Sequence, residues 1–170
     1  MKVLTLLVLA FFMASPVFAE IQERDGDSPI LHTATEDIQM NAAMAKARKT
    51  IQVILPKLST VEGPLPISIK ANIKDDKHSE HVWISNVRLV DGNFTGPLDN
   101  NPLHIKKFKV GDEISVAPEE ISDWYAISGK RIHGGYTIFL ARARMSAEQR
   151  VDFDKTFPYF KYMEEQQKVK

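Results

Sequence analysis

Three carboxylates and one histidine are the side chains in this chain best suited to acid–base chemistry. Glu80, Asp99 and Asp123 could provide the acid and the base of a hydrolase, provided that two of them reach the same substrate. No spacing in the sequence forces them together, and carboxylates are common on protein surfaces. A small hydrolase that uses Glu80, His81 and Asp123 is therefore one candidate function, and purely structural carboxylates are the alternative.

Histidines suggest a second kind of chemistry, because His78 and His81 lie only three residues apart. A zinc site would need a third protein ligand, which His104 or His133 would have to supply. A spacing of three aligns side chains on a helix but not in a strand or a turn. We therefore expect a polar turn that enters a strand, with no metal and no cofactor. The chain contains no cysteine, so thiol chemistry is excluded.

The stretch 121–137 concentrates aromatic, hydroxyl and charged groups around two adjacent glycines, Gly134 and Gly135. These glycines either open a helix whose N–H groups hold an anion or form a tight turn that lets Tyr136 pack. Asp123 either caps a turn or faces a ligand. We hypothesise that Asp123 converges with Glu80 and His81 on one surface. The candidate binding surface comprises Glu80, His81, Trp83, Asn100, Asp123, Trp124, Tyr136 and Thr137, with Trp124 as its floor.

The N-terminus has the pattern of a secretory signal peptide. Lys2 is followed by an apolar run over 3–13, and Val17-Phe18-Ala19 resembles a cleavage site. The apolar run is shorter than the ~20 residues of a membrane-spanning helix. We expect a signal peptide over 1–19, cleavage near Ala19, and a periplasmic or secreted protein without stable membrane insertion.

The rest of the chain is predicted to form one domain. We expect a flexible leader over 20–34, a single domain over 35–162 and a solvated tail over 163–170. The 22 basic and 22 acidic residues balance, and this argues against a nucleic-acid-binding protein, which normally carries a basic stripe. Without disulfides, the domain must be stabilised by packing alone.

A helix is predicted at the start of the domain. Thr35 or Asp37 is a suitable N-cap, and Pro56 predicts a kink or a break near Leu55. Apolar residues then recur at spacings of four and three and define one buried stripe: Met40, Met44, Ala47, Ile51, Ile54 and Leu58.

Strands and turns are predicted to follow. Residues 67–74 alternate between apolar and polar side chains, as in a half-buried strand, and 81–90 predicts a strand with a bulge near Ser85-Asn86. Asp91-Gly92 is a hairpin turn signal. Further expected elements are a strand after Gly111-Asp112, short strands at 124–127 and 131–132, a helix rather than a strand at 136–144, and a helix over 147–157 after the capping box that starts at Ser146.

Four short motifs carry a family resemblance. They are Glu80-His81-Val82-Trp83, Gly96-Pro97-Leu98-Asp99-Asn100-Asn101-Pro102, Ile121-Ser122-Asp123-Trp124 and Gly134-Gly135-Tyr136-Thr137. In this order they resemble the YegJ-like family (domain of unknown function 2314), and the similarity covers about 40–157. The resemblance implies a small bacterial protein, exported in some members, with no established activity and therefore no catalytic residue to transfer.

The expected fold is α+β, because helices are confined to the ends and turn signals separate short strands between them. We expect an N-terminal amphipathic helix packed on a strongly bent, barrel-like antiparallel sheet of about five or six short strands, and a C-terminal helix. The leading function is a non-catalytic periplasmic binding or interaction protein, inhibitor- or immunity-like, whose partner is another exported or envelope protein. The hydrolase and a structural envelope protein without a ligand are the alternatives.

Overall fold

The computed structural model describes residues 20–24, 27–32, 37–58, 66–129 and 131–158. The predicted signal peptide and the predicted tail over 163–170 lie outside these ranges. The described residues form an α+β fold, as predicted, with three helices, a four-stranded sheet, a three-stranded sheet and a separate hairpin. The elements are β1 (Glu20–Arg24), β2 (Asp27–His32), α1 (Ile38–Leu58), β3 (Ile67–Lys74), β4 (Ser79–Ile84), β5 (Arg88–Val90), β6 (Asn93–Pro97), β7 (Glu113–Val116), the 3-10 helix η1 (Pro118–Glu120), β8 (Ile121–Ser128), β9 (Arg131–Gly134), α2 (Tyr136–Arg144) and α3 (Ala147–Thr156).

Helix α1 begins where the sequence predicts. The Met40 amide donates a hydrogen bond of 3.0 Å to Oδ1 of Asp37, so Asp37 caps the first turn. Of the predicted stripe, Met40, Ala47 and Ile51 are buried and Met44 is half-buried, so this face of α1 packs on the core. A kink or a break was predicted near Leu55, and the break is wrong, because the helix continues through Pro56 to Leu58. A proline in the last turn removes only one hydrogen bond of the helix.

The four-stranded sheet has the order β4-β3-β8-β9, and its neighbours are all antiparallel. Strand β3 alternates between buried and partly exposed residues, as its sequence predicts. Ile69 pairs with Ile84 on one side and with Trp124 on the other, which places three large apolar side chains in one row. Strand β8 begins at Ile121, three residues before the start that the sequence predicts.

The strand predicted over 81–90 is divided between two sheets. Asn86 has a φ of 46°, and at this corner the chain leaves the four-stranded sheet. It then forms β5, which belongs to the sheet β5-β6-β7. Gly96 in β6 crosses the corner so closely that a Cβ atom there would lie 2.5 Å from the carbonyl oxygen of Ser85. The described strands thus form two sheets that do not close into a barrel, instead of one bent sheet.

The predicted turns and the C-terminal helices are confirmed. Asp91 and Gly92 have positive φ values of 49° and 82° in the hairpin between β5 and β6. Residues 136–144 form α2 rather than a strand. Helix α3 begins with the predicted capping box, in which Ser146 and Gln149 exchange side-chain to backbone hydrogen bonds of 3.2 and 2.9 Å.

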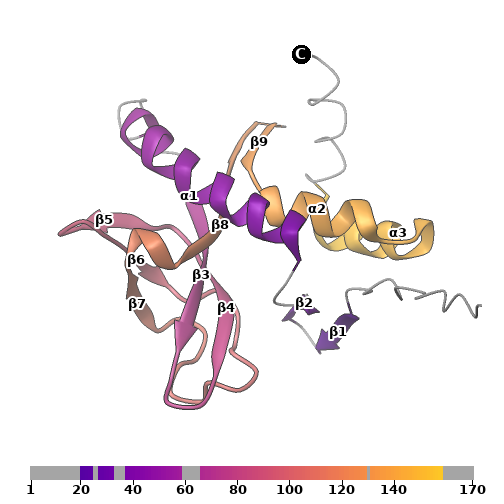
Figure 1. Ribbon diagram of the computed structural model, residues 1–170, viewed down its shortest axis with the longest axis horizontal. Helices are drawn as coiled ribbons and strands as arrows, with labels where there is room; N and C mark the ends of the chain where they lie inside the picture. The colour runs from indigo at the N-terminus through magenta and orange to yellow at the C-terminus, as the bar shows by residue number, and fades with distance from the viewer. Residues whose placement is uncertain (1–19, 25–26, 33–36, 59–65, 130, 159–170) are drawn as a thin grey trace, which may run out of the picture.

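The described residues form two hydrophobic cores, and Figure 1 shows the helices α1, α2 and α3 that contribute to them. The main core joins α1 to both sheets and contains Ile51, Ile69, Phe94 and Trp124. A smaller core under α2 and α3 centres on buried Ile132, Met145 and Phe153. Within the described part of the chain, no helix combines the length and the hydropathy needed to cross a bilayer.

The segment predicted as a loose leader contains secondary structure that the sequence analysis did not anticipate. Strands β1 and β2 pair antiparallel, with Ile21 opposite Leu31 and Gln22 opposite Ile30. The register shifts between Gln22 and Arg24.

Candidate functional site

Asp123 forms the polar centre of the 121–137 stretch, and it is fully buried. Its Oδ1 accepts hydrogen bonds from the amides of Trp124 (2.8 Å) and Tyr136 (3.0 Å). Its Oδ2 accepts bonds from the Thr137 amide (2.7 Å), the Thr137 hydroxyl (2.6 Å) and the Ile138 amide (3.3 Å). Asp123 therefore holds the first N–H groups of α2, which have no acceptor within the helix.

The two glycines explain how this carboxylate reaches the helix. Gly135 has a φ of 72° at the N-cap of α2, and a Cβ atom on Gly134 would lie 2.1 Å from the Trp124 carbonyl oxygen. The two glycines therefore form a tight turn, and α2 begins directly after it. The anion that this helix end holds is the side chain of Asp123 itself. Burial raises the pKa of Asp123, while the hydrogen bonds from Thr137 and Trp124 and the charge of Lys70 oppose this rise.

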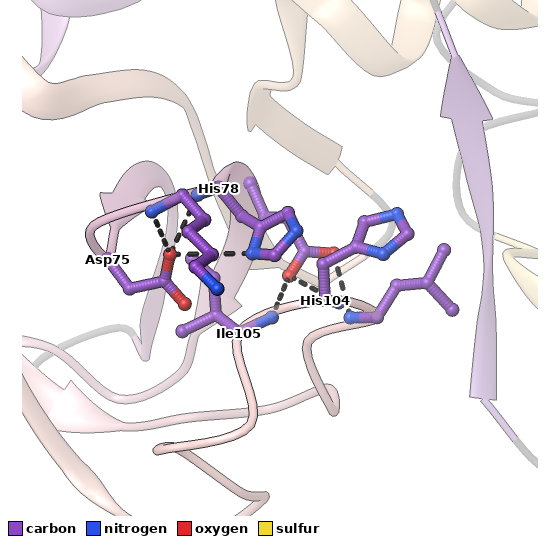
Figure 2. Close-up of polar contacts among 7 residues, drawn as sticks. Asp75, His78, His104 and Ile105 are labelled. Atoms are coloured by element: carbon purple, nitrogen blue, oxygen red, sulfur yellow. Dashed lines mark hydrogen bonds and ion pairs between the residues drawn. The ribbon is translucent and has the colours of Figure 1, made fainter.

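Glu80 has a similar structural role in a different place. Its Oε1 accepts a hydrogen bond of 2.7 Å from the Leu103 amide. Its Oε2 accepts bonds of 2.9 Å from the amides of both His104 and Ile105, and Figure 2 shows this loop against the end of the β3–β4 hairpin. Partial burial raises the pKa of Glu80, but the three backbone hydrogen bonds outweigh it, so the pKa lies below its ordinary value.

Two histidines stack beside this loop (Figure 2). The rings of His78 and His104 lie 5.4 Å apart and nearly parallel, at an angle of 19°. Asp75 accepts hydrogen bonds from the amides of Lys77 (2.8 Å) and His78 (2.7 Å), so it caps the turn between β3 and β4. Over the described ranges, no three His, Asp or Glu side chains are grouped as metal ligands.

The hydrogen bond between His81 and Ser122 resembles the histidine–serine pair of a hydrolase. The direction of the hydrogen bond differs, because here the histidine is the donor. Its Nδ1 lies 2.8 Å from Oγ of Ser122, and the Ser122 hydroxyl donates to the Lys70 carbonyl oxygen at 3.1 Å. His81 Nδ1 must then donate to Ser122, so the histidine does not remove the serine proton. Loss of hydration and the charges of Lys70 and Arg48 lower the pKa of His81 to about 4, although the residue is exposed.

The predicted binding surface is divided between the interior and the exterior. Asp123 and Trp124 have no exposed area, and Thr137 and Asn100 are also buried. The Trp124 indole packs in the main core and donates to Oγ1 of Thr50 at 3.0 Å. The hypothesis that Trp124 is the floor of an open site is therefore wrong, because a side chain inside the core cannot contact a ligand on the surface.

Two of the three candidate carboxylates, Glu80 and Asp123, bind to different segments. Asp123 is bound to α2, whereas Glu80 is bound to the loop 103–105. His81 contacts Ser122 rather than either carboxylate. Of the predicted set, Glu80, His81, Trp83 and Tyr136 retain exposed area.

An aromatic and cationic face remains around β4, and we call it the β4 face: Lys70, His81, Trp83 and Tyr125. The rings of Trp83 and Tyr125 meet edge to face with centroids 5.1 Å apart, and the Lys70 Nζ lies 5.9 Å from the Trp83 ring. The sequence did not indicate Lys70 as a member. The alternation of apolar and polar side chains over 67–74 could have indicated Lys70, since it places Lys70 on the face of β3 opposite the buried one.

Comparison with known proteins identifies a bacterial family. The family model described as "Uncharacterized protein conserved in bacteria (DUF2314)" matches residues 37–159. The "Uncharacterized protein YegJ" of Escherichia coli is 33% identical over 138 residues, which cover 81% of this chain and 85% of that protein.

A second relative is longer than this chain. The "Putative ankyrin repeat protein" of Neisseria meningitidis serogroup B is 27% identical over 138 residues, which cover 76% of this chain and 54% of that protein. No solved structure matches. The extent of the family match and the identity to the Escherichia coli relative show that this chain belongs to the bacterial DUF2314 family.

Proposed function

We propose that the protein is a non-catalytic binding protein that recognises another protein through the β4 face. The observation that carries this proposal is the state of two of the three candidate carboxylates, the two that the hydrolase alternative would use. Asp123 is buried and accepts five hydrogen bonds, and Glu80 accepts three from the main chain. A catalytic acid or base must reach the proton that it transfers, and these oxygens are already occupied by structural donors.

The composition of the β4 face supports protein recognition. Trp and Tyr are enriched in protein interfaces, where they supply most of the binding energy. Trp83 and Tyr125 already contact each other, so little side-chain freedom is lost when a partner covers them. The name of the Neisseria meningitidis relative refers to ankyrin repeats, an architecture whose stacked repeats create extended binding surfaces.

The proposal includes export, with a partner in the periplasm or outside the cell. Its support is the signal-peptide pattern of residues 1–19. In the specific form of the proposal that we favour, this protein is itself an inhibitor- or immunity-like protein that binds another exported protein. Mass spectrometry of the protein from its native host should give an N-terminus at Glu20, and an intact Met1 on a membrane-bound chain would contradict export.

Affinity capture from envelope extract tests the binding function. We expect the wild-type chain to retain a partner that Trp83→Ala loses and Leu89→Ala retains. Leu89 is a matched control, because its side chain is 55% exposed and belongs to β5, outside the β4 face. Circular dichroism should first show that both variants remain folded.

Two other outcomes would favour the alternatives. Hydrolysis of an ester, amide or glycoside by the wild-type chain, abolished in both Glu80→Gln and His81→Ala, would favour the hydrolase. Retention of the same partner by the wild type and Trp83→Ala would remove the β4 face from the proposal. No partner at all would favour a structural envelope protein.

A further inference from the structure

A groove lies between α1 and α2. Its volume is about 300 Å³, at the small end of the range for ligand pockets. Eight residues line it: Gln39, Ala42, Ala43 and Lys46 of α1, Gly134 at the end of β9, and Tyr136, Phe139 and Leu140 of α2.

The groove exists because α1 presents small side chains at this point. Ala42 and Ala43 have no atoms beyond Cβ, whereas the facing α2 residues Tyr136, Phe139 and Leu140 are large and partly exposed. The space between the two helices is therefore not filled by the chain itself. Its walls are mainly apolar, so an apolar group that enters it is removed from water at a gain in free energy.

Lys46 provides the charge of the groove. Its Nζ lies 4.9 Å from the centroid of the Tyr136 ring, and this contact holds the ammonium group at the groove wall. Among the described residues, no carboxylate forms an ion pair with Lys46. The nearby Arg144 is different, because Asp37 and Gln39 already accept its hydrogen bonds. A bound anion would therefore pair with Lys46, which has no carboxylate partner among the described residues.

We infer that the α1–α2 groove binds a medium-chain aliphatic carboxylate. The alkyl chain lies between the alanines of α1 and the aromatic side chains of α2, and the carboxylate pairs with Lys46. This site is independent of the β4 face and of the proposed protein partner. A small ligand with one ion pair gives weak binding, with a Kd on the order of 0.1–1 mM.

Titration of the ¹⁵N-labelled full chain with octanoate, octanol and octylammonium tests the inference by NMR. We expect octanoate to shift the amide signals of 39–46 and 136–140 selectively. Octanol should bind about 5- to 10-fold more weakly, and octylammonium more weakly still, because the charge of Lys46 distinguishes the three head groups. High salt should reduce octanoate binding and leave octanol binding unchanged.

Matched variants test separately how the alkyl chain and the carboxylate of octanoate contribute to binding. Ala42→Leu fills the groove and should weaken octanoate at least about 10-fold, whereas Ala45→Leu, an exposed α1 position outside the groove, should not. Lys46→Gln should reduce octanoate affinity to that of octanol, and Lys46→Arg should retain it. Unchanged thermal unfolding of Ala42→Leu would show that the fold is preserved.

Three results with the alkyl probes would overturn the inference. Octanoate could produce no localised shifts, it could bind Ala42→Leu as well as the wild type, or octylammonium could bind as tightly as octanoate. Selective shifts with an acidic amphipathic peptide but not with octanoate would assign the groove to a protein partner instead, and would also overturn the carboxylate site. None of these results affects the capture experiment on Trp83.

Discussion

Asp123 and Glu80 have the same structural role in two regions of the molecule. Each carboxylate binds successive backbone N–H groups of a segment far along the chain: 136–138 for Asp123 and 103–105 for Glu80. They differ in burial, because Asp123 is fully buried and Glu80 is partly exposed.

This difference decides how much each carboxylate contributes to stability. Near Glu80, water can replace a lost acceptor, so the amides of the loop keep hydrogen bonds when the side chain is removed. Near Asp123, water is excluded, and every donor left without an acceptor carries its full desolvation cost. Two side chains that look alike as catalytic candidates in the sequence are therefore structural residues of very different importance.

Removal of Asp123 should have the largest effect. We expect Asp123→Ala to lower the free energy of unfolding by at least ~3 kcal/mol, because it leaves several buried donors at the start of α2 unsatisfied. Chemical denaturation is the measurement. Thr137→Val, which removes only the hydroxyl bond of 2.6 Å, is the control and should cost ~1 kcal/mol. Equal destabilisation by Asp123→Ala and Glu80→Ala would refute the role assigned to burial.

Removal of Glu80 should have a smaller and more local effect. We expect Glu80→Ala to cost ~1–2 kcal/mol and to accelerate hydrogen exchange at the amides of Leu103, His104 and Ile105. Exposed Glu119 is the control, since Glu119→Ala should change stability by no more than ~0.5 kcal/mol. Unchanged exchange in the loop would show that Glu80 does not hold it.

The two carboxylates should also respond to pH in opposite directions. The pKa of Glu80 is lowered, so its stabilisation is complete above its ordinary value of about 4.3 and is lost as pH falls through the lowered pKa. The pKa of Asp123 is raised, so its contribution is complete below about 3.9 and declines as pH rises through the raised pKa.

Carboxyl ¹³C titration measures both pKa values directly. Denaturation of Glu80→Gln and Asp123→Asn across this pH range measures the stability difference from the wild type. Glu80→Gln should approach the wild type as pH falls, whereas Asp123→Asn should approach it as pH rises. A shift of both pKa values in the same direction would mean that burial does not separate the two sites.

Asp75 extends the comparison to a turn at the surface and should show the smallest effect. It caps the turn before β4 through the amides of Lys77 and His78, which are exposed. We expect Asp75→Asn to reduce stability less than Glu80→Ala does, as measured by the same denaturation assay. A cost as large as that of Asp123→Ala would contradict the ranking by exposure.

Local patterns in the sequence determined much of the fold. The stripe of α1, the cap at Asp37, the alternation of β3, the Asp91-Gly92 turn and the box at Ser146 are all observed. Each depends on residues that are close in sequence, so the signal and the contact lie within the same few residues.

The role of the candidate site was decided only by tertiary structure. Asp123 meets its partners 13 to 15 residues away, Glu80 at 23 to 25, and Trp124 meets Thr50 at a separation of 74. No local rule predicts which distant N–H group a carboxylate will bind. The corner at Asn86 is also set by tertiary contacts, since Gly96 must cross it closely. Composition and spacing can identify an aspartate as important, but only the packing of α2 on β8 makes it a buried cap rather than a catalytic acid.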